Sequence, residues 1–238
     1  MLKIINNILF NKANKSTVFQ HDDPFVQDVI KDPELTWLIS FPRTGSHWLR
    51  MMMELYFEKP GLVLIYKYKN AKSFTCYHWH DSDLTTSKKR NVIYLYRGAV
   101  DTIFSQVKFE REDITDTERV IFWTRKYAKH LSKWILEEDF TKKKTLILYE
   151  NLINNPVQEF HKITNHYNQE LDEEKFEKVL SKITKEKIKK KTRHDQQVIN
   201  LSKDYQKERQ DFRRNFSDLI TSQFLEIDER LIALKLND

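Results

Sequence analysis

Scarcity of glycine is the feature of this sequence that most restricts its possible folds. Only three glycines, Gly45, Gly61 and Gly98, occur in 238 residues, whereas about 7% would be usual. A chain that uses so little glycine keeps it where the backbone geometry leaves few alternatives. Gly45 and Gly98 each follow a short apolar run and precede a helical pattern. These two strand-to-helix junctions are therefore the first places to look for a functional site.

Composition excludes several classes of protein. Hydrophobic residues make up 39% of the chain and aromatic residues 13%, which is enough apolar material for a core and excludes a wholly disordered chain. Cys76 is the single cysteine, so the chain can form neither an internal disulfide nor a multi-thiolate metal site. We therefore expect a reducing compartment and a cytoplasmic protein.

Charge and hydropathy narrow the expected partners. The formal net charge is +6, which suits an anionic ligand but is too modest to indicate nucleic acid. No apolar stretch approaches the roughly 20 residues that span a bilayer, and residues 1–10 lack the cleavage site of a signal peptide. We expect neither a nucleic-acid partner nor a membrane span.

Short apolar runs alternate with segments of helical periodicity along most of the chain. Such runs are typical of buried strands, and they occupy residues 35–41, 62–66, 73–77, 91–96 and 145–149. Helical spacing of apolar residues is found in 46–57, 99–109 and 116–138. Asn155 and Pro156 predict the capped start of a further helix. This alternation predicts an α/β fold with a central parallel sheet flanked by helices on both faces.

No linker or internal repeat divides the chain, so we expect residues 1–238 to form a single domain. Within it, residues 1–33 are an N-terminal extension, 34–171 the α/β core, and 172–238 a charged helical part that folds back on the core. The lysine-rich stretch from Lys182 to Arg193 is interpreted as a solvated helix face in preference to a ligand-binding patch.

The residues around Gly45 have the chemistry of an anion-binding loop. The segment is Phe41-Pro42-Arg43-Thr44-Gly45-Ser46-His47-Trp48. It combines a cation, hydroxyl groups and a glycine turn with the unpaired amides of a helix N-terminus, whose dipole favours a phosphate. The Gly-Lys-Ser/Thr ending of a Walker A loop is missing, which argues against a nucleoside-triphosphate enzyme.

Residues 43–48 resemble the 5′-phosphosulfate loop of the sulfotransferases that use 3′-phosphoadenosine 5′-phosphosulfate (PAPS). The second glycine junction strengthens the resemblance, because Arg97 ends an apolar run and Ser105 lies eight residues later, like the pair that holds the 3′-phosphate in this family. An arginine at a strand end and a hydroxyl two turns into the next helix can converge on one anion. The resemblance extends over residues 36–219 and implies a P-loop-like sulfotransferase fold.

The same resemblance implies roles for residues outside the two junctions. His80 fits the position of the family's catalytic base better than His78 does, and a neutral imidazole with a pKa near 6.5 is a suitable base. Tyr149 resembles the tyrosine that reaches the adenine in this family. Trp48 could stack on the adenine or pack beneath the helix that carries Trp48. Where the family has a glycine-containing loop that clamps the 3′-phosphate, this chain lacks the glycines and offers Arg209, Arg213 and Arg214.

Other interpretations of the histidines remain beside this one. His78 and His80 could be ordinary loop residues, or form a metal site with Asp81. A metal would require at least a third well-placed ligand, and Asp81 adjoins His80 awkwardly. The resemblance implies that no metal is required.

We therefore expect sulfuryl transfer from PAPS to a hydroxyl or amine of a small-molecule or carbohydrate acceptor, with 3′-phosphoadenosine 5′-phosphate (PAP) as product. Acceptor-lining aromatic residues could be Tyr66, Tyr68, Phe74 and Trp79. The alternatives are a P-loop kinase or related phosphotransferase, a basic module that binds an anionic polymer without catalysis, and a cofactor-binding relative without turnover.

Overall fold

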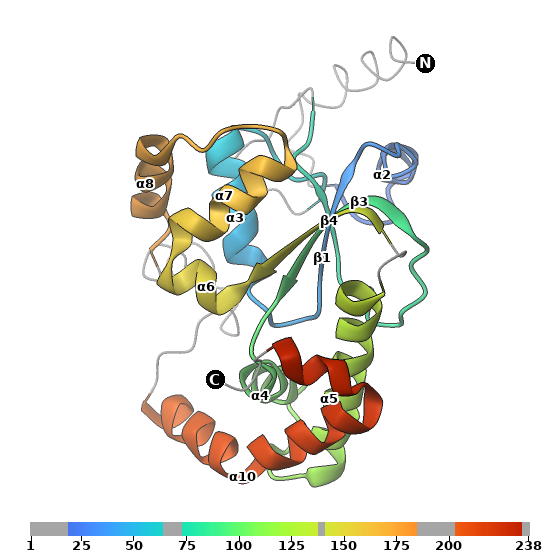
Figure 1. Cartoon of the computed structure of the whole chain (residues 1–238), viewed down its shortest axis with the longest axis vertical. Helices are drawn as coiled ribbons and strands as arrows, with labels where there is room; N and C mark the ends of the chain where they lie inside the picture. The colour runs from blue at the N-terminus through green and yellow to red at the C-terminus, as the bar shows by residue number, and fades with distance from the viewer. Residues whose placement is uncertain (1–18, 64–72, 138–140, 185–202, 235–238) are drawn as a thin grey trace.

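A parallel four-stranded sheet organises the fold, and Figure 1 shows it with helices around it. The computed structural model describes residues 19–63, 73–137, 141–184 and 203–234. The strands are β1 (Thr36–Ser40), β2 (Tyr77–Trp79), β3 (Lys89–Tyr96) and β4 (Thr141–Leu148), in the order β2-β1-β3-β4. All three neighbouring pairs run parallel, which confirms the predicted sheet.

Helices cover both faces of the sheet, also as predicted. One face packs against α3 (Ser46–Phe57), α7 (Pro156–His166) and α8 (Glu173–Lys182). The other packs against α4 (Ala99–Phe109) and α5 (Thr117–Leu131), and α10 (Lys203–Ile227) packs on these two helices. Short elements complete the order: α2 (Pro24–Val29), η1 (Ser132–Leu136), α6 (Tyr149–Asn154) and η3 (Glu229–Leu234). Among the described helices, none is both long and apolar enough to cross a membrane.

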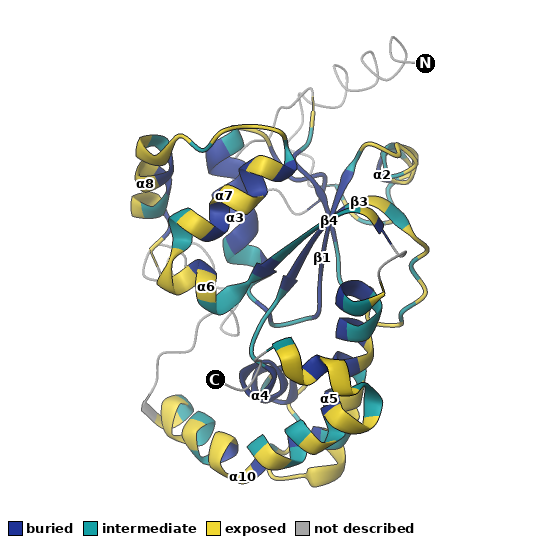
Figure 2. Ribbon diagram, viewed as in Figure 1, coloured by how far each residue is buried: buried dark blue, intermediate teal, exposed yellow. Residues whose placement is uncertain are grey.

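Neighbouring residues of one strand enter different cores. Side chains alternate between the faces of a strand, so Trp37 belongs to the core under α4, α5 and α10, whereas Leu38 belongs to the core under α3, α7 and α8. Figure 2 shows the helices buried on the sides turned toward the rest of the fold and exposed on the sides turned outward. Burial on both faces explains why the strand sequences are almost continuously apolar.

The structure corrects several predicted boundaries. The strand expected at 73–77 begins only at Tyr77, because Thr75 N donates to Pro60 O and Cys76 O accepts from Leu62 N instead of pairing with β1. The helix expected at 116–138 ends as α5 at Leu131 and continues as the π-helical turn η1.

Three further expectations concern the start of α7, the strand at 62–66 and the lysine-rich stretch. Asn155 precedes α7, but its side chain bonds Gln158 and does not cap a backbone amide. Leu62 and Val63 lie in an irregular segment, and residues 64–66 of the expected strand lie outside the described residues. Lys182 is exposed at the end of α8, and residues 185–193 of the lysine-rich stretch are also outside the described part.

A buried carboxylate fixes the loop that follows β2. Asp81 is fully buried and has a left-handed backbone, with φ of 47°. Its Oδ1 accepts from Thr86 N at 2.8 Å, and its Oδ2 accepts from Lys133 Nζ at 2.7 Å and Trp134 Nε1 at 2.9 Å. Each carboxylate oxygen therefore has its donors, and the loop is attached to η1.

We expect Asp81→Asn to destabilise the protein by about 3–5 kcal/mol, the cost of breaking a buried ion pair. The new amide NH2 would face one of the donors that now bind the carboxylate, leaving that donor unsatisfied. Urea denaturation measures the loss, with Asp83→Asn as control, since Asp83 is exposed and accepts its hydrogen bonds from the nearby Thr85. Equal stabilities of the two variants would contradict this account.

Candidate active site

The carboxyl ends of all four strands deliver predicted site residues to one edge of the sheet. His80 follows β2, the loop 41–45 follows β1, Arg97 follows β3, and Tyr149 follows β4. The chain passes from β1 to β2 on one side and then to β3 on the other. Such a reversal of strand order creates a crevice at the carboxyl edge, where open α/β sheets bind ligands.

A cavity of about 370 Å³ lies at this edge. Seven predicted site residues line it: Arg43, Gly45, Ser46, His47, His80, Arg97 and Tyr149. Gln106 and Phe109 of α4 and its C-cap residue Glu110 also line it and were not singled out from the sequence. The helical spacing of the sequence could have indicated them, because positions 106, 109 and 110 lie on one face of the same helical stretch.

The anion-binding loop has the local geometry that its sequence predicts. Gly45 is the N-cap of α3 and has φ of 96°, a conformation that favours glycine. Arg43 also has a left-handed backbone, with φ of 70°. Thr44 is fully buried and its hydroxyl donates to Phe41 O at 2.8 Å, so this side chain holds the turn together and does not line the cavity.

Tyr149, directly after β4, packs its ring against the loop. A Cβ added at Gly45 would collide with the Tyr149 ring, and the Arg97 guanidinium lies over the same ring at 4.8 Å from its centroid. The Trp48 ring meets Tyr149 edge-on at 6.3 Å, while its Nε1 donates to Ile183 O at 3.3 Å. Trp48 therefore packs between α3 and the end of α8, and it does not line the cavity.

Arg97 lines the cavity and Ser105 does not, and the two residues do not contact each other directly in the described structure. The Ser105 hydroxyl accepts from Arg43 Nε at 3.1 Å, and Arg97 Nη1 donates to Arg43 O at 3.2 Å. Arg43 also lies over the Phe109 ring, 4.9 Å from its centroid. Arg43 and Arg97, the cations of the two junctions, thus contact each other and line one cavity.

The C-terminal arginines lie on a helix and not on a loop. Residues 209–216 belong to α10, so their backbone amides are engaged in the helix and only side chains can supply charge. Arg209 and Arg213, one turn apart, both bind the carboxylate of Asp101 on α4. Arg214 points elsewhere: its side chain is 76% exposed and pairs with Asp211 at 2.9 Å. Asp101 was not singled out from the sequence.

His80 is held in the tautomer that a general base needs. Its Nδ1 lies 2.8 Å from Ser40 O, and because a carbonyl only accepts, Nδ1 carries the hydrogen and Nε2 keeps its lone pair in the neutral ring. Burial lowers the pKa of His80 below its usual 6.5, although the bond to Ser40 opposes the shift. The imidazole is therefore mostly neutral at pH 7.

His78 has a different environment. It is buried, its Nε2 lies 3.3 Å from the Ser40 hydroxyl, and it does not line the cavity. Burial and the nearby cations hold its pKa well below the usual value. No group of three or more His, Cys, Asp or Glu suited to a metal ion is found among the described residues, and Asp81 is engaged by Lys133 and Trp134.

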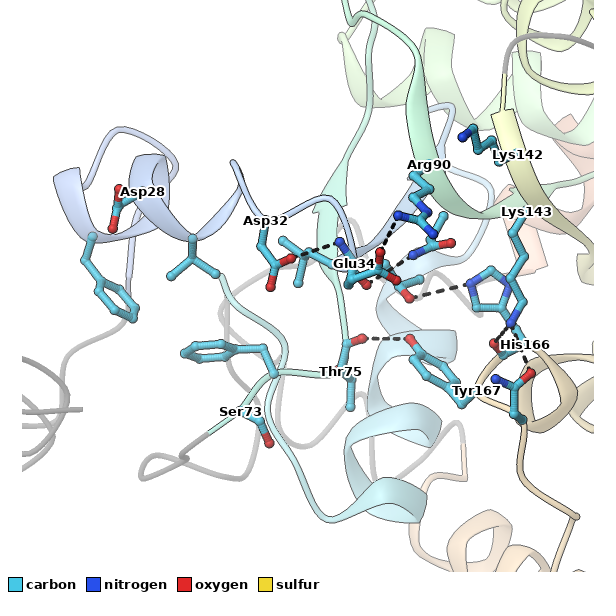
Figure 3. Close-up of a pocket in the computed structure, with 17 residues that line it drawn as sticks. Asp28, Asp32, Glu34, Ser73, Thr75, Arg90, Lys142, Lys143, His166 and Tyr167 are labelled. Atoms are coloured by element: carbon cyan, nitrogen blue, oxygen red, sulfur yellow. Dashed lines mark hydrogen bonds and ion pairs between the residues drawn. The ribbon is translucent and has the colours of Figure 1, made fainter. Parts of the chain in front are cut away.

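A larger cavity, of about 760 Å³, lies at the opposite edge of the sheet, near the amino ends of β1, β3 and β4 (Figure 3). Its polar groups bind one another: Glu34 pairs with Arg90, and His166 lies between Thr36 and Thr145. Phe74 lines this cavity and Trp79 stacks on Tyr77, so neither predicted acceptor aromatic lines the cavity at the carboxyl edge. Tyr66 and Tyr68 lie outside the described residues.

Known proteins were compared with the sequence and with the fold. A family model described as a sulfotransferase domain matches residues 61–218. A solved structure of mouse sulfotransferase SULT7A1 complexed with PAP superimposes with a TM-score of 0.57 and 16% sequence identity, covering 85% of this chain and 87% of that one. No curated protein matches the sequence. The family match includes His80, Arg97 and Tyr149 but begins after the loop around Gly45.

We expect Gly45→Ala to destabilise the protein by more than about 1 kcal/mol, because an L-residue is strained in this conformation and the Tyr149 ring would have to move. Gly61→Ala is the matched control, since a Cβ there would lie 3.5 Å from Val63 O, an ordinary contact. Urea denaturation of both variants checks the prediction. A loss at Gly61 equal to that at Gly45 would show that the loop geometry is not responsible.

Proposed function

The chain belongs to the sulfotransferase domain family, and we propose that the cavity at the carboxyl edge of its sheet is where it transfers a sulfuryl group from PAPS to an acceptor hydroxyl or amine. The observation that carries this proposal is the joining of two cationic sites, around Arg43 and Arg97, at the topological switch point of the sheet. A ligand with anionic groups at both ends suits such a pair of sites.

The residues present fit this nucleotide at both of its ends. The amides at the start of α3 and the Arg43 side chain face the cavity that a 5′-phosphosulfate would enter. Arg97 Nε is buried and lies 3.9 Å from Glu150 Oε1, beyond hydrogen-bonding distance. This donor, with Arg209 and Arg213 nearby, suits a 3′-phosphate.

Each residue then has a role in the transfer. PAPS supplies the sulfuryl group, whose bond to the 5′-phosphate oxygen breaks as the bond to the acceptor forms, and PAP is released. Arg43 stabilises the negative charge that develops on the leaving oxygen. His80 Nε2 takes the proton of the acceptor hydroxyl or amine. The remaining residues position the nucleotide, and positioning supplies a large share of the rate.

Nucleotide binding tests the donor site. We expect the protein to bind PAP more tightly than 5′-AMP in calorimetric titrations, because only PAP carries a 3′-phosphate. Arg97→Ala should weaken PAP binding by about 10-fold or more, the loss expected for a hydrogen bond between charged groups, and should change 5′-AMP binding much less. Arg230→Ala is the control, since Arg230 is exposed and pairs with Asp228, away from the cavity. Equal affinities of wild-type protein for the two nucleotides would refute the proposed site.

Catalysis tests the base. We expect His80→Ala to lower kcat about 10²–10⁴-fold with little change in the Kd of PAP, measured with radiolabelled PAPS and a panel of sugars, phenols, steroids and peptides. His161→Ala, at an exposed histidine of α7, should leave kcat unchanged. Full activity of the His80 variant toward its acceptor would rule out this assignment.

The pH profile follows from the lowered pKa of His80. The neutral imidazole is the active form, so kcat should fall as pH drops through this pKa, and the acid limb should lie below pH 6.5. Above that value His80 is already neutral, so its ionisation should no longer change the rate with pH. The acid limb should be missing from the profile of His80→Ala, and an identical limb in that variant would assign it to another group.

A further inference from the structure

One carboxylate of α4 binds three arginines from two distant segments. Arg209 Nε donates to Asp101 Oδ1 at 2.8 Å, and Arg209 Nη2 donates to Oδ2. Arg213 Nη2 donates to Oδ1 at 3.1 Å, and Arg97 Nη2 lies 3.5 Å from Oδ2. The Asp101 side chain is only 7% exposed, so its contacts with the arginines are shielded from water. Nothing in the sequence analysis assigned a role to this residue.

The charges of this cluster do not balance within it. Three guanidinium groups surround one carboxylate, and the other nearby carboxylate, Glu150, lies 3.9 Å from Arg97. A guanidinium has five N–H donors, and Asp101 engages two of Arg209 and one each of Arg213 and Arg97. Donors and positive charge therefore remain for a further anion beside Asp101.

Among the described residues, Asp101 is the group that joins the two arginines of α10 to Arg97, which is also held by Arg43 O. Arg209 and Arg213 extend from α10, where their side chains are 34% and 44% exposed, and long exposed side chains gain rotamer freedom when released. Like charges at this distance also repel each other. Loss of the Asp101 charge would let both side chains of α10 turn toward solvent.

We propose that Asp101 is a positioning residue, which gathers Arg97, Arg209 and Arg213 at the end of β3 and so makes this site selective for the 3′-phosphate of the nucleotide. The inference rests on the proposed function and names a determinant of specificity within it.

The place of Asp101 in the fold supports this role. It lies in the first turn of α4, one turn after Arg97 and one turn before Ser105, so its carboxylate shares a helix face with both predicted phosphate ligands. Burial alone would raise the pKa of Asp101, but the hydrogen bonds and charges of the arginines outweigh burial and lower it. The group is therefore an anion at neutral pH.

The test is a comparison of two nucleotides and two substitutions. We expect Asp101→Asn, which keeps the shape and removes the charge, to weaken PAP binding by about 10-fold or more, the loss expected for a hydrogen bond between charged groups. Binding of 5′-AMP should stay within about twofold of wild type, a shift too small for the loss of even one such bond. In kinetics, KM for PAPS should rise while kcat at saturating PAPS stays unchanged.

Asp101→Glu separates charge from shape. It keeps the carboxylate but adds a methylene, so a purely structural role predicts that Glu is worse tolerated than the isosteric Asn. Gathering of the arginines predicts the reverse order for PAP binding. Asp211→Asn is the matched control on α10, since Asp211 pairs only with the exposed Arg214 in the described structure. This substitution should change the binding affinity for neither PAP nor 5′-AMP.

Several results would overturn the proposal. Equal or tighter PAP binding by Asp101→Asn would show that the carboxylate competes with the phosphate for the arginines. An equal loss for PAP and 5′-AMP, or a failure of both substitutions to fold, would make Asp101 a determinant of the fold alone. If the wild-type protein itself does not prefer PAP, the proposed function fails, and this outcome is distinct from the others.

Discussion

Arginines from three separate parts of the chain must lie close together at one edge of the sheet, although their charges repel. Arg43 comes from the loop after β1, Arg97 from the end of β3, and Arg209 from α10. Partners that are themselves buried or fixed make the arrangement possible: the Asp101 carboxylate, the Ser105 hydroxyl and the Tyr149 ring. In a site assembled in this way, these partners offset part of the repulsion between the cations.

The candidate base, His80, is also held by buried partners, but these partners are neutral. His80 donates to Ser40 O, and its own carbonyl accepts from His130 Nε2 at 2.7 Å. His130 Nδ1 in turn lies 2.7 Å from the Tyr94 hydroxyl, which donates to it because Nε2 carries the ring hydrogen. Burial lowers the pKa of His130 to about 4, so this chain of bonds stays neutral. Such a network sets both the tautomer and the direction of the His80 ring.

Local patterns predicted much of the architecture and part of the site. The apolar runs located β1, β3 and β4, and Ala99–Phe109 was predicted with both ends as observed, because strand and helix periodicities are properties of neighbouring residues. The position of β2 was wrong, since hydrogen bonds of residues 75 and 76 with residues 60 and 62 displace it. The helical form of residues 209–216 also differed from the loop that the resemblance implied, and the absence of glycine there is consistent with a helix.

The sequence by itself located β1, β3 and β4, and therefore most of the side chains that reach the carboxyl edge of a parallel sheet. Only the tertiary structure decided how those side chains are paired. Ser105 binds Arg43, which is 62 positions away, and Asp101 binds Arg209, which is 108 positions away. Pairs so distant in sequence leave no periodic signal, because their contact depends on how whole helices pack against the sheet and against one another.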